Sequence, residues 1–161
     1  MFTLARFSEA FLLLRGTTVG LELRWIPMLI VIMNVVYALT SYPAGRLSDR
    51  IGRYGLLALI VADVLLALAD GLVYLGAGVA LWGLHMGLSQ GLLASLVADT
   101  ASADLRGTAF GLFNLVSGVG VLAVSVMAGL LWDGFGAAAV FWTGAGLAAT
   151  AAVGFTALRP R

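Results

Sequence analysis

Five long apolar runs divide this sequence and exclude most water-soluble folds. Each run is close to the length of about 20 residues that a helix needs to cross the hydrocarbon core of a bilayer. The runs are residues 25–43, 55–75, 76–98, 108–132 and 137–158. We therefore predict an all-α integral membrane protein, a multi-pass helical bundle with five complete transmembrane helices in a single domain over residues 1–161.

The composition agrees with a lipid environment. Hydrophobic residues make up 61% of the chain and charged residues 11%, whereas a soluble domain carries about 25% charged residues. The net charge of +1 is too small to indicate a nucleic-acid partner. The lack of cysteine excludes disulfide bonds and thiolate metal sites.

The sequence contains no arrangement of residues that predicts an enzyme. It has no Gly-rich phosphate-binding loop ending in Gly-Lys-Ser/Thr and no Gly-x-Ser-x-Gly nucleophile elbow. His85, the single histidine, has no second metal ligand at a usable spacing. We therefore expect no catalytic residues, no metal and no cofactor.

A charged strip, residues 44–54, separates the first two apolar runs. Its charged residues are Arg46, Asp49, Arg50 and Arg53. Hydrocarbon does not solvate such a cluster, so the strip must lie in water at a membrane surface. Pro43 disfavours a helix that continues past Tyr42, and Gly45 permits a turn of the backbone.

The arginines predict the orientation, because basic residues concentrate in cytoplasmic loops. Alternating helices place six arginines on one side: Arg46, Arg50, Arg53, Arg106, Arg159 and Arg161. The opposite turns, around residues 70–74 and 133–136, contain none. We therefore assign the arginine side to the cytoplasmic face of the plasma (inner) membrane. The segments assigned to it are residues 44–54, 99–107 and 159–161. Arg15 and Arg24 do not fit, since they would flank the opposite face.

The pattern Gly45-x-Leu47-x-Asp49-Arg50-x-Gly52-Arg53 resembles the signature loop of major facilitator superfamily transporters. In that family the loop joins helix 2 to helix 3, and again helix 8 to helix 9. Residues 98–111 and 129–136 resemble the connections between helices 10 and 11 and between helices 11 and 12. The resemblance implies the C-terminal, six-helix half of the fold, with residues 1–15 as a remnant of helix 7.

The resemblance also implies a function, the transport of a small solute by alternating access between two halves. The implied partners are the lipid bilayer, the solute, protons in a coupled exchange, and a second half. A chain that starts at Met1, inside helix 7, lacks the first half, so another copy or a separate half would have to supply it. The alternative is a non-transporting membrane fragment or an accessory subunit that packs with another half.

The family's signature loop gates transport, and the resemblance carries this role to six residues here. They are Gly45, Arg46, Asp49, Arg50, Gly52 and Arg53. The Asp49 carboxylate lies close to the start of the next helix, where it can cap amides and meet the positive end of the helix dipole. The resemblance implies that it latches the loop to a neighbouring helix. The alternative for Arg50 and Arg53 is that they only enforce the topology.

Asp63 lies near the middle of its apolar run, where a carboxylate costs roughly 2.5–3.5 kcal/mol on insertion scales. It must face protein or a water-filled cavity, or carry a proton. Asp70, seven residues on, is predicted to share its helical face. One interpretation is a proton-coupling carboxylate. The other is a polar contact with Asn34, Ser41 or a buried water.

Other polar residues are candidates to contact a substrate or a proton. They are Arg6, Glu9, Asn34, His85, Gln90 and Asn114. Arg6 and Glu9, three residues apart, form either an intramembrane ion pair next to the substrate or ordinary hydrated charges at the surface. His85 is either a hydrogen-bonded helix histidine or part of a proton relay. The three amides either line a cavity or bridge helices.

Glycine supplies a helix-packing pattern in the third run. Gly83, Gly87 and Gly91 recur every four residues and form one groove where the backbone of another helix can approach. Gly107 and Gly111 repeat the spacing. The alternative to a specific role is generic close packing without any part in substrate binding.

Overall fold

Six α-helices and two short 3-10 turns make up the described part of the chain, residues 7–46 and 48–157 of this computed structural model. The side chains of residues 44–46, 48–53, 91–96, 103 and 155–157 also lie outside the description. The elements are α1 (Ala10–Thr18), η2 (Leu23–Trp25), α2 (Ile26–Arg46), α3 (Ser48–Ala67), α4 (Leu72–Thr100), η3 (Ala103–Leu105), α5 (Arg106–Phe135) and α6 (Ala137–Ala157). Helices suit an apolar solvent because each pairs its own backbone N–H and C=O groups.

Four apolar stretches of the described chain are long enough to cross a bilayer as helices. They are Leu23–Pro43, Leu72–Gln90, Arg106–Phe135 and Ala137–Gly154. The apolar part of α3, Tyr54–Ala67, is shorter. The predicted fold class, an all-α multi-pass membrane bundle, is therefore confirmed, with four helices of full spanning length and one shorter helix where the sequence predicted five.

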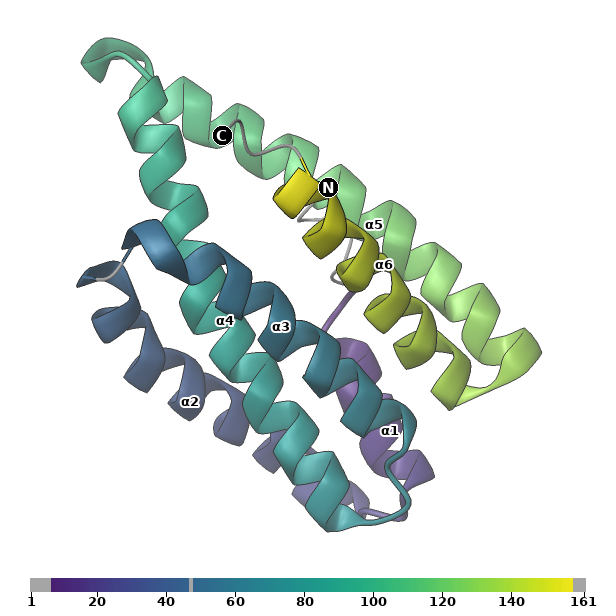
Figure 1. The fold of residues 1–161 in the computed structure, drawn as a ribbon. Coiled ribbons are helices and arrows are strands. Elements are labelled where there is room, and N and C mark those ends of the chain that lie inside the picture. Colours follow the sequence, from purple (N-terminus) through teal and green to yellow (C-terminus); the bar gives the residue numbers. More distant parts are fainter. Residues whose placement is uncertain (1–6, 47, 158–161) are drawn as a thin grey trace.

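Helix α4 lies at the centre of the bundle, between α2 and α3 (Figure 1). Helix α6 packs against α3, and α5 runs alongside α6. Among the described residues, 50% of the span Leu72–Gln90 in α4 is buried inside the chain, but only 11% of the α5 span. Helix α5 therefore presents most of its surface outward, to lipid or to another protein.

Glycines bring α4 very close to both of its neighbours. A methyl group on Gly83 would collide with the backbone carbonyl of Met33 in α2, and one on Gly87 with the Thr40 side chain. On the other side, a methyl group on Gly78 would lie 2.6 Å from Leu66 Cγ in α3. Helices in lipid gain little from hydrophobic burial, so small residues that permit close van der Waals contact hold them together.

The hairpin between α2 and α3 differs from the sequence prediction. Helix α2 continues through Pro43 to Arg46, and α3 already begins at Ser48, so most of the strip 44–54 is helical. The predicted break after Tyr42 and the predicted turn at Gly45 are therefore wrong. Proline removes only the one hydrogen bond that its own N–H would make, and this close to the helix end the remaining bonds suffice.

Two glycines with left-handed backbone conformations end helices. Gly20, at φ +90°, follows α1, where Leu21 N–H bonds the Gly16 carbonyl at 3.0 Å in a Schellman motif. Gly136, at φ +84°, is the single residue between α5 and α6. A side chain would strain either position, and both turns reverse the chain within a few residues.

Arg15, in α1, closes the C-terminal end of α3. Its Nε donates to the carbonyl oxygen of Leu66 at 2.8 Å, and its Nη2 donates to those of Ala67 and Ala69, both at 3.0 Å. The last carbonyls of a helix lack partners within it and form the negative end of the helix dipole, so a guanidinium satisfies both needs. This contact explains an arginine that did not fit the cytoplasmic pattern.

Replacing Arg15 by Gln is expected to lower the free energy of unfolding by about 1–3 kcal/mol, because the end of α3 loses its charged donors. Thermal unfolding of the purified chain in detergent, followed by tryptophan fluorescence, measures the change. Arg24→Gln is the matched control, since Arg24 pairs with the exposed Glu22, 2.7 Å away, and lies over the exposed Trp25 ring, 5.7 Å from its centroid. Exposed ion pairs contribute about 0–1 kcal/mol, and exposed cation–π contacts about 0.5–1 kcal/mol. Equal destabilisation by both changes would contradict the capping role.

Replacing Gly83 by Ala is expected to destabilise the bundle by about 1–3 kcal/mol, since the new methyl group cannot fit without moving the α2 backbone. Gly111→Ala is the control, because nothing lies within 4 Å of a methyl group there and Ala has the higher helix propensity. The same thermal measurement compares the two variants. If Gly83→Ala unfolds at the same temperature as Gly111→Ala, the contact between α4 and α2 is not as described.

Candidate functional site

The buried polar side chains of the described chain lie on α3 and α4. Among the described residues, the polar or charged side chains that are buried are those of Asp63 on α3 and of His85 and Ser89 on α4. Trp82, His85 and Ser89 follow one another at intervals of three and four residues and so share one face of α4. The glycine face of α4, which packs against α2, is a different one.

The His85 ring bridges α4 and α3. Its Nδ1 lies 2.8 Å from the carbonyl oxygen of Gly55. A carbonyl oxygen only accepts, so Nδ1 carries a proton and donates. The Ser89 hydroxyl donates to the carbonyl oxygen of His85 at 2.6 Å. His85 is thus a hydrogen-bonded helix histidine, which is one of the two interpretations of the sequence. A part for His85 in a proton relay stays a prediction.

Asp63 is fully buried between α3 and α6. Neither carboxylate oxygen has a hydrogen-bond partner among the described residues, and the same holds for Trp82 Nε1. A methyl group built on Gly144 of α6 would lie 2.7 Å from Asp63 Oδ2 and 2.9 Å from Cε1 of Phe7. The carboxyl group therefore packs directly against the α6 backbone and beside the Phe7 ring.

Three predictions about the surroundings of Asp63 are wrong. Helix α3 ends at Ala67, so Asp63 lies one turn before the helix end and not in the middle of an apolar run. Asp70 lies in the turn after α3, where it is exposed and shares no helical face with Asp63. Asn34 and Ser41 bond the carbonyls of their own helix, at Ile30 and Ala38, and not the carboxylate. The reason in each case is that composition located the apolar run but not the turn within it.

The amide candidates fall in different places. Gln90 Oε1 accepts a hydrogen bond from the Tyr37 hydroxyl at 3.4 Å, across the contact between α4 and α2. Asn34 on α2 and Asn114 on α5 are both exposed on this chain. The structure thus makes Gln90 a bridge between helices and leaves the other two amides on the outer surface.

The charged candidates at the N-terminus are only partly described. Glu9 is half-buried at the start of α1, where its side chain makes no capping hydrogen bond. Arg6 lies outside the described residues, so the predicted pairing of Arg6 with Glu9 stays a prediction. The next residues are anchored, because Ser8 N–H bonds the Ser125 hydroxyl of α5 at 3.0 Å.

The signature strip lies at the hairpin between α2 and α3. Gly45 and Arg46 end α2, and Asp49 is the second residue of α3, followed within two turns by three more members of the strip. These are Arg50, Gly52 and Arg53. Side chains of all six strip residues lie outside the description, as does the environment of Gly91 on α4. Their gating and packing roles stay predictions.

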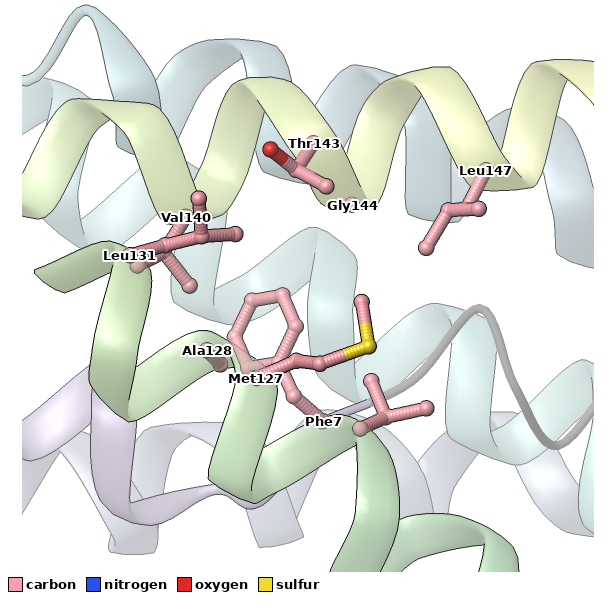
Figure 2. Close-up of a pocket in the computed structure, with 9 residues that line it drawn as sticks. Phe7, Met127, Ala128, Leu131, Val140, Thr143, Gly144 and Leu147 are labelled. Carbon is pink, nitrogen blue, oxygen red and sulfur yellow. The ribbon is translucent and has the colours of Figure 1, made fainter. Parts of the chain in front are cut away.

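A small crevice of about 10 Å³ lies between α5 and α6 (Figure 2). Figure 2 shows the Phe7 ring inside it, between Met127 of α5 and Val140 of α6. Among its described lining residues Thr143 alone is polar, and none is a candidate from the sequence. A crevice of this size holds about one water molecule, and its apolar lining offers a polar solute almost no hydrogen bonds.

Sequence reasoning missed the residues that act through tertiary contacts. Gly144 and Phe7 cover Asp63, and Arg15 caps α3. The only available signal was Arg15 itself, a cation on the side of the membrane that the other arginines avoid. Among the described residues there is no group of three or more His, Cys, Asp or Glu side chains that could hold a metal ion.

Spanning apolar helices joined by a charged hairpin define a multi-pass membrane protein. Residues 9–161 match the Major Facilitator Superfamily. The chain therefore belongs to this superfamily, whose members are transporters.

The curated relatives are longer than this chain. An uncharacterized MFS-type transporter of Methanocaldococcus jannaschii is 36% identical over 148 residues, which cover 82% of this chain and 36% of the relative. Uncharacterized proteins of Mycobacterium bovis and Mycobacterium tuberculosis are 28% identical over 99 residues, or 60% of this chain and 24% of each relative. The chain thus spans 36% or less of these relatives. No solved structure gives a significant match.

Replacing His85 by Asn is expected to preserve the bond to Gly55, because the Asn amide nitrogen occupies nearly the place of Nδ1. His85→Gln places its amide too far along the side chain and should lower the free energy of unfolding by about 1–3 kcal/mol relative to Asn, since it leaves buried polar groups unpaired. Thermal unfolding in detergent distinguishes the two variants. Equal unfolding temperatures, or a more stable Gln variant, would contradict the assigned bond.

Proposed function

We propose that this chain forms one half of a secondary transporter, which carries a small solute across the plasma membrane by alternating access. The proposal is supported by the superfamily match over residues 9–161 and by the charged signature strip at the hairpin between α2 and α3. A second half, from another segment or another copy of the chain, would complete the path. The strip would face the cytoplasm.

The observation that carries this proposal is the exposure of Asn34 and Asn114 on two spanning helices. Hydrocarbon offers no partner for a primary amide, so lipid is an unfavourable neighbour for both side chains. A polar solute path between two halves would solvate them. The largely unburied surface of α5 supplies the area that a second half would cover.

Within this scheme the candidate residues take three roles. Asp49, in the first turn of α3, latches the strip to a neighbouring helix in one conformation of the transporter. In the other conformation this latch is released, so that the strip acts as a gate. Glu9, beside the packed segment Phe7–Ser8, exchanges a proton or contacts the solute, with Arg6 as a site for an anionic group. Gln90 and Tyr37 link α4 to α2 next to the proposed path.

Asp49→Asn in the complete transporter is expected to lower gradient-driven solute flux about fivefold or more, the lower range of a typical coupling energy. A growth or toxicity screen of the intact gene against a solute panel identifies the solute, and proteoliposomes then give the initial rate. Asp104→Asn, at an exposed acid of η3, is the control and should transport at the normal rate. Equal flux in the Asp49→Asn and unmodified proteins would exclude the gating role. A complete assembly that carries no solute from the panel would favour the accessory-subunit alternative.

A further inference from the structure

Asp63 is the one acidic side chain of the described chain that is fully buried, and neither of its oxygens has a hydrogen-bond donor there. An ionised carboxylate without a donor or a counter-charge is strongly disfavoured in an apolar interior. The conformation described here therefore holds Asp63 as the neutral carboxylic acid. This argument uses only burial and missing partners, and does not depend on transport.

Helix α6 packs closely against one oxygen of the Asp63 carboxyl group. The α6 backbone at Gly144 approaches Oδ2 so closely that a methyl group would lie only 2.7 Å away, and the Phe7 ring lies beside the same point. Phe7 is itself held by Trp82 and Phe141, with ring centroids 5.2 and 5.5 Å from its own. The carboxyl group, the α6 backbone and the Phe7 ring thus form one packed contact.

The described side chains packed against Asp63 supply no counter-charge. Helix α6 has no titratable side chain between Ala137 and Ala157. On α4 the buried His85 is engaged with Gly55, two helical turns before Asp63. From α1, Arg15 binds the carbonyls that end α3. Within the described part, neither Arg15 nor Glu9 forms a hydrogen bond with Asp63.

The other titratable side chains that the structure describes on these elements lie at helix ends and are exposed. They are Tyr54 before the apolar part of α3, Asp70 after it, Tyr74 and Asp99 at the ends of α4, and Arg106 and Asp133 at the ends of α5. An ionised Asp63 must therefore find water. Because it lies one turn from the end of α3, a small separation of α6 from α3 would admit water from the nearby surface.

A small crevice of about 10 Å³ lies beside this contact. It borders Gly144 and Phe7 on the side of α6 that faces α5 (Figure 2). Helix α6 packs less extensively against α5 than against α3, and α5 itself is largely unburied within the described chain. Opening the contact at Gly144 therefore means moving α6 away from α3, toward its less tightly packed side.

We propose that Asp63 is a proton-binding site that controls helix packing: the protonated carboxyl holds α6 against α3 at Gly144, and loss of the proton separates the two helices. The contact is thus closed at acidic pH and open at alkaline pH. Asp63→Asn, which mimics the neutral acid in size and charge, keeps the helices together at every pH.

Two measurements on the 161-residue chain in lipid nanodiscs test the proposal. The infrared C=O stretch of a protonated carboxylic acid without a hydrogen bond should be present at neutral pH and absent from Asp63→Asn. Since the chain has no cysteine, spin labels at Val61→Cys and Gly146→Cys, both exposed, report the distance between α3 and α6. This distance should increase from acidic to alkaline pH, and stay constant in Asp63→Asn.

Two further variants complete the design. Asp70→Asn is the matched control and should keep the full pH response, because Asp70 is exposed. Gly144→Ala inserts a methyl group against the carboxyl and should hold the helices in the separated state even at acidic pH. A neutral-pH spectrum without the protonated band, or a pH response that persists in Asp63→Asn, would overturn the proposal. Neither readout measures flux, so a failed transport assay leaves this test unaffected.

Discussion

The approach of α4 to α2 through Gly83 and Gly87 is the contact on which the rest of the bundle depends. In lipid, apolar side chains gain little by leaving the solvent, so two helices adhere only where their backbones come close enough for dense van der Waals contact. The glycine face fixes α4 in this position. Its other face must then meet α3, and that face carries Trp82, His85 and Ser89, so the position of the buried polar groups follows from the glycine contact.

The low dielectric of the interior determines how each buried polar group is satisfied. The guanidinium of Arg15 binds three carbonyls at the end of α3, and the His85 ring binds the Gly55 carbonyl. Both contacts join elements far apart in the sequence and satisfy their polar groups. Among the described residues Asp63 and Trp82 Nε1 are the exceptions. Of these two groups only Asp63 can change its charge, and a group that is unsatisfied in one conformation gains from another.

Several features were predictable because they depend only on composition and local order. Long apolar runs predict spanning helices in any tertiary arrangement, since the backbone in lipid has no other way to pair its polar groups. The strip around Asp49 and Arg50 predicts a helical hairpin at the membrane surface because charges cannot enter hydrocarbon. The errors concern breaks in the runs. One apolar run concealed the end of α3 at Ala67, and Pro43 did not end α2. An apolar turn and an apolar helix look alike in a sequence whose solvent is also apolar.

The sequence by itself determined the class of this protein, its helical elements, its membership of a transporter superfamily and the hairpin that carries the charged strip. The tertiary structure alone decided which side of each helix is buried, and so which polar residues meet. Lipid-facing and buried faces of a membrane helix are both apolar, so no periodicity separates them. For this reason the sequence named Asp63 and Arg15, but only the packed helices placed Gly144 against the first and the end of α3 against the second.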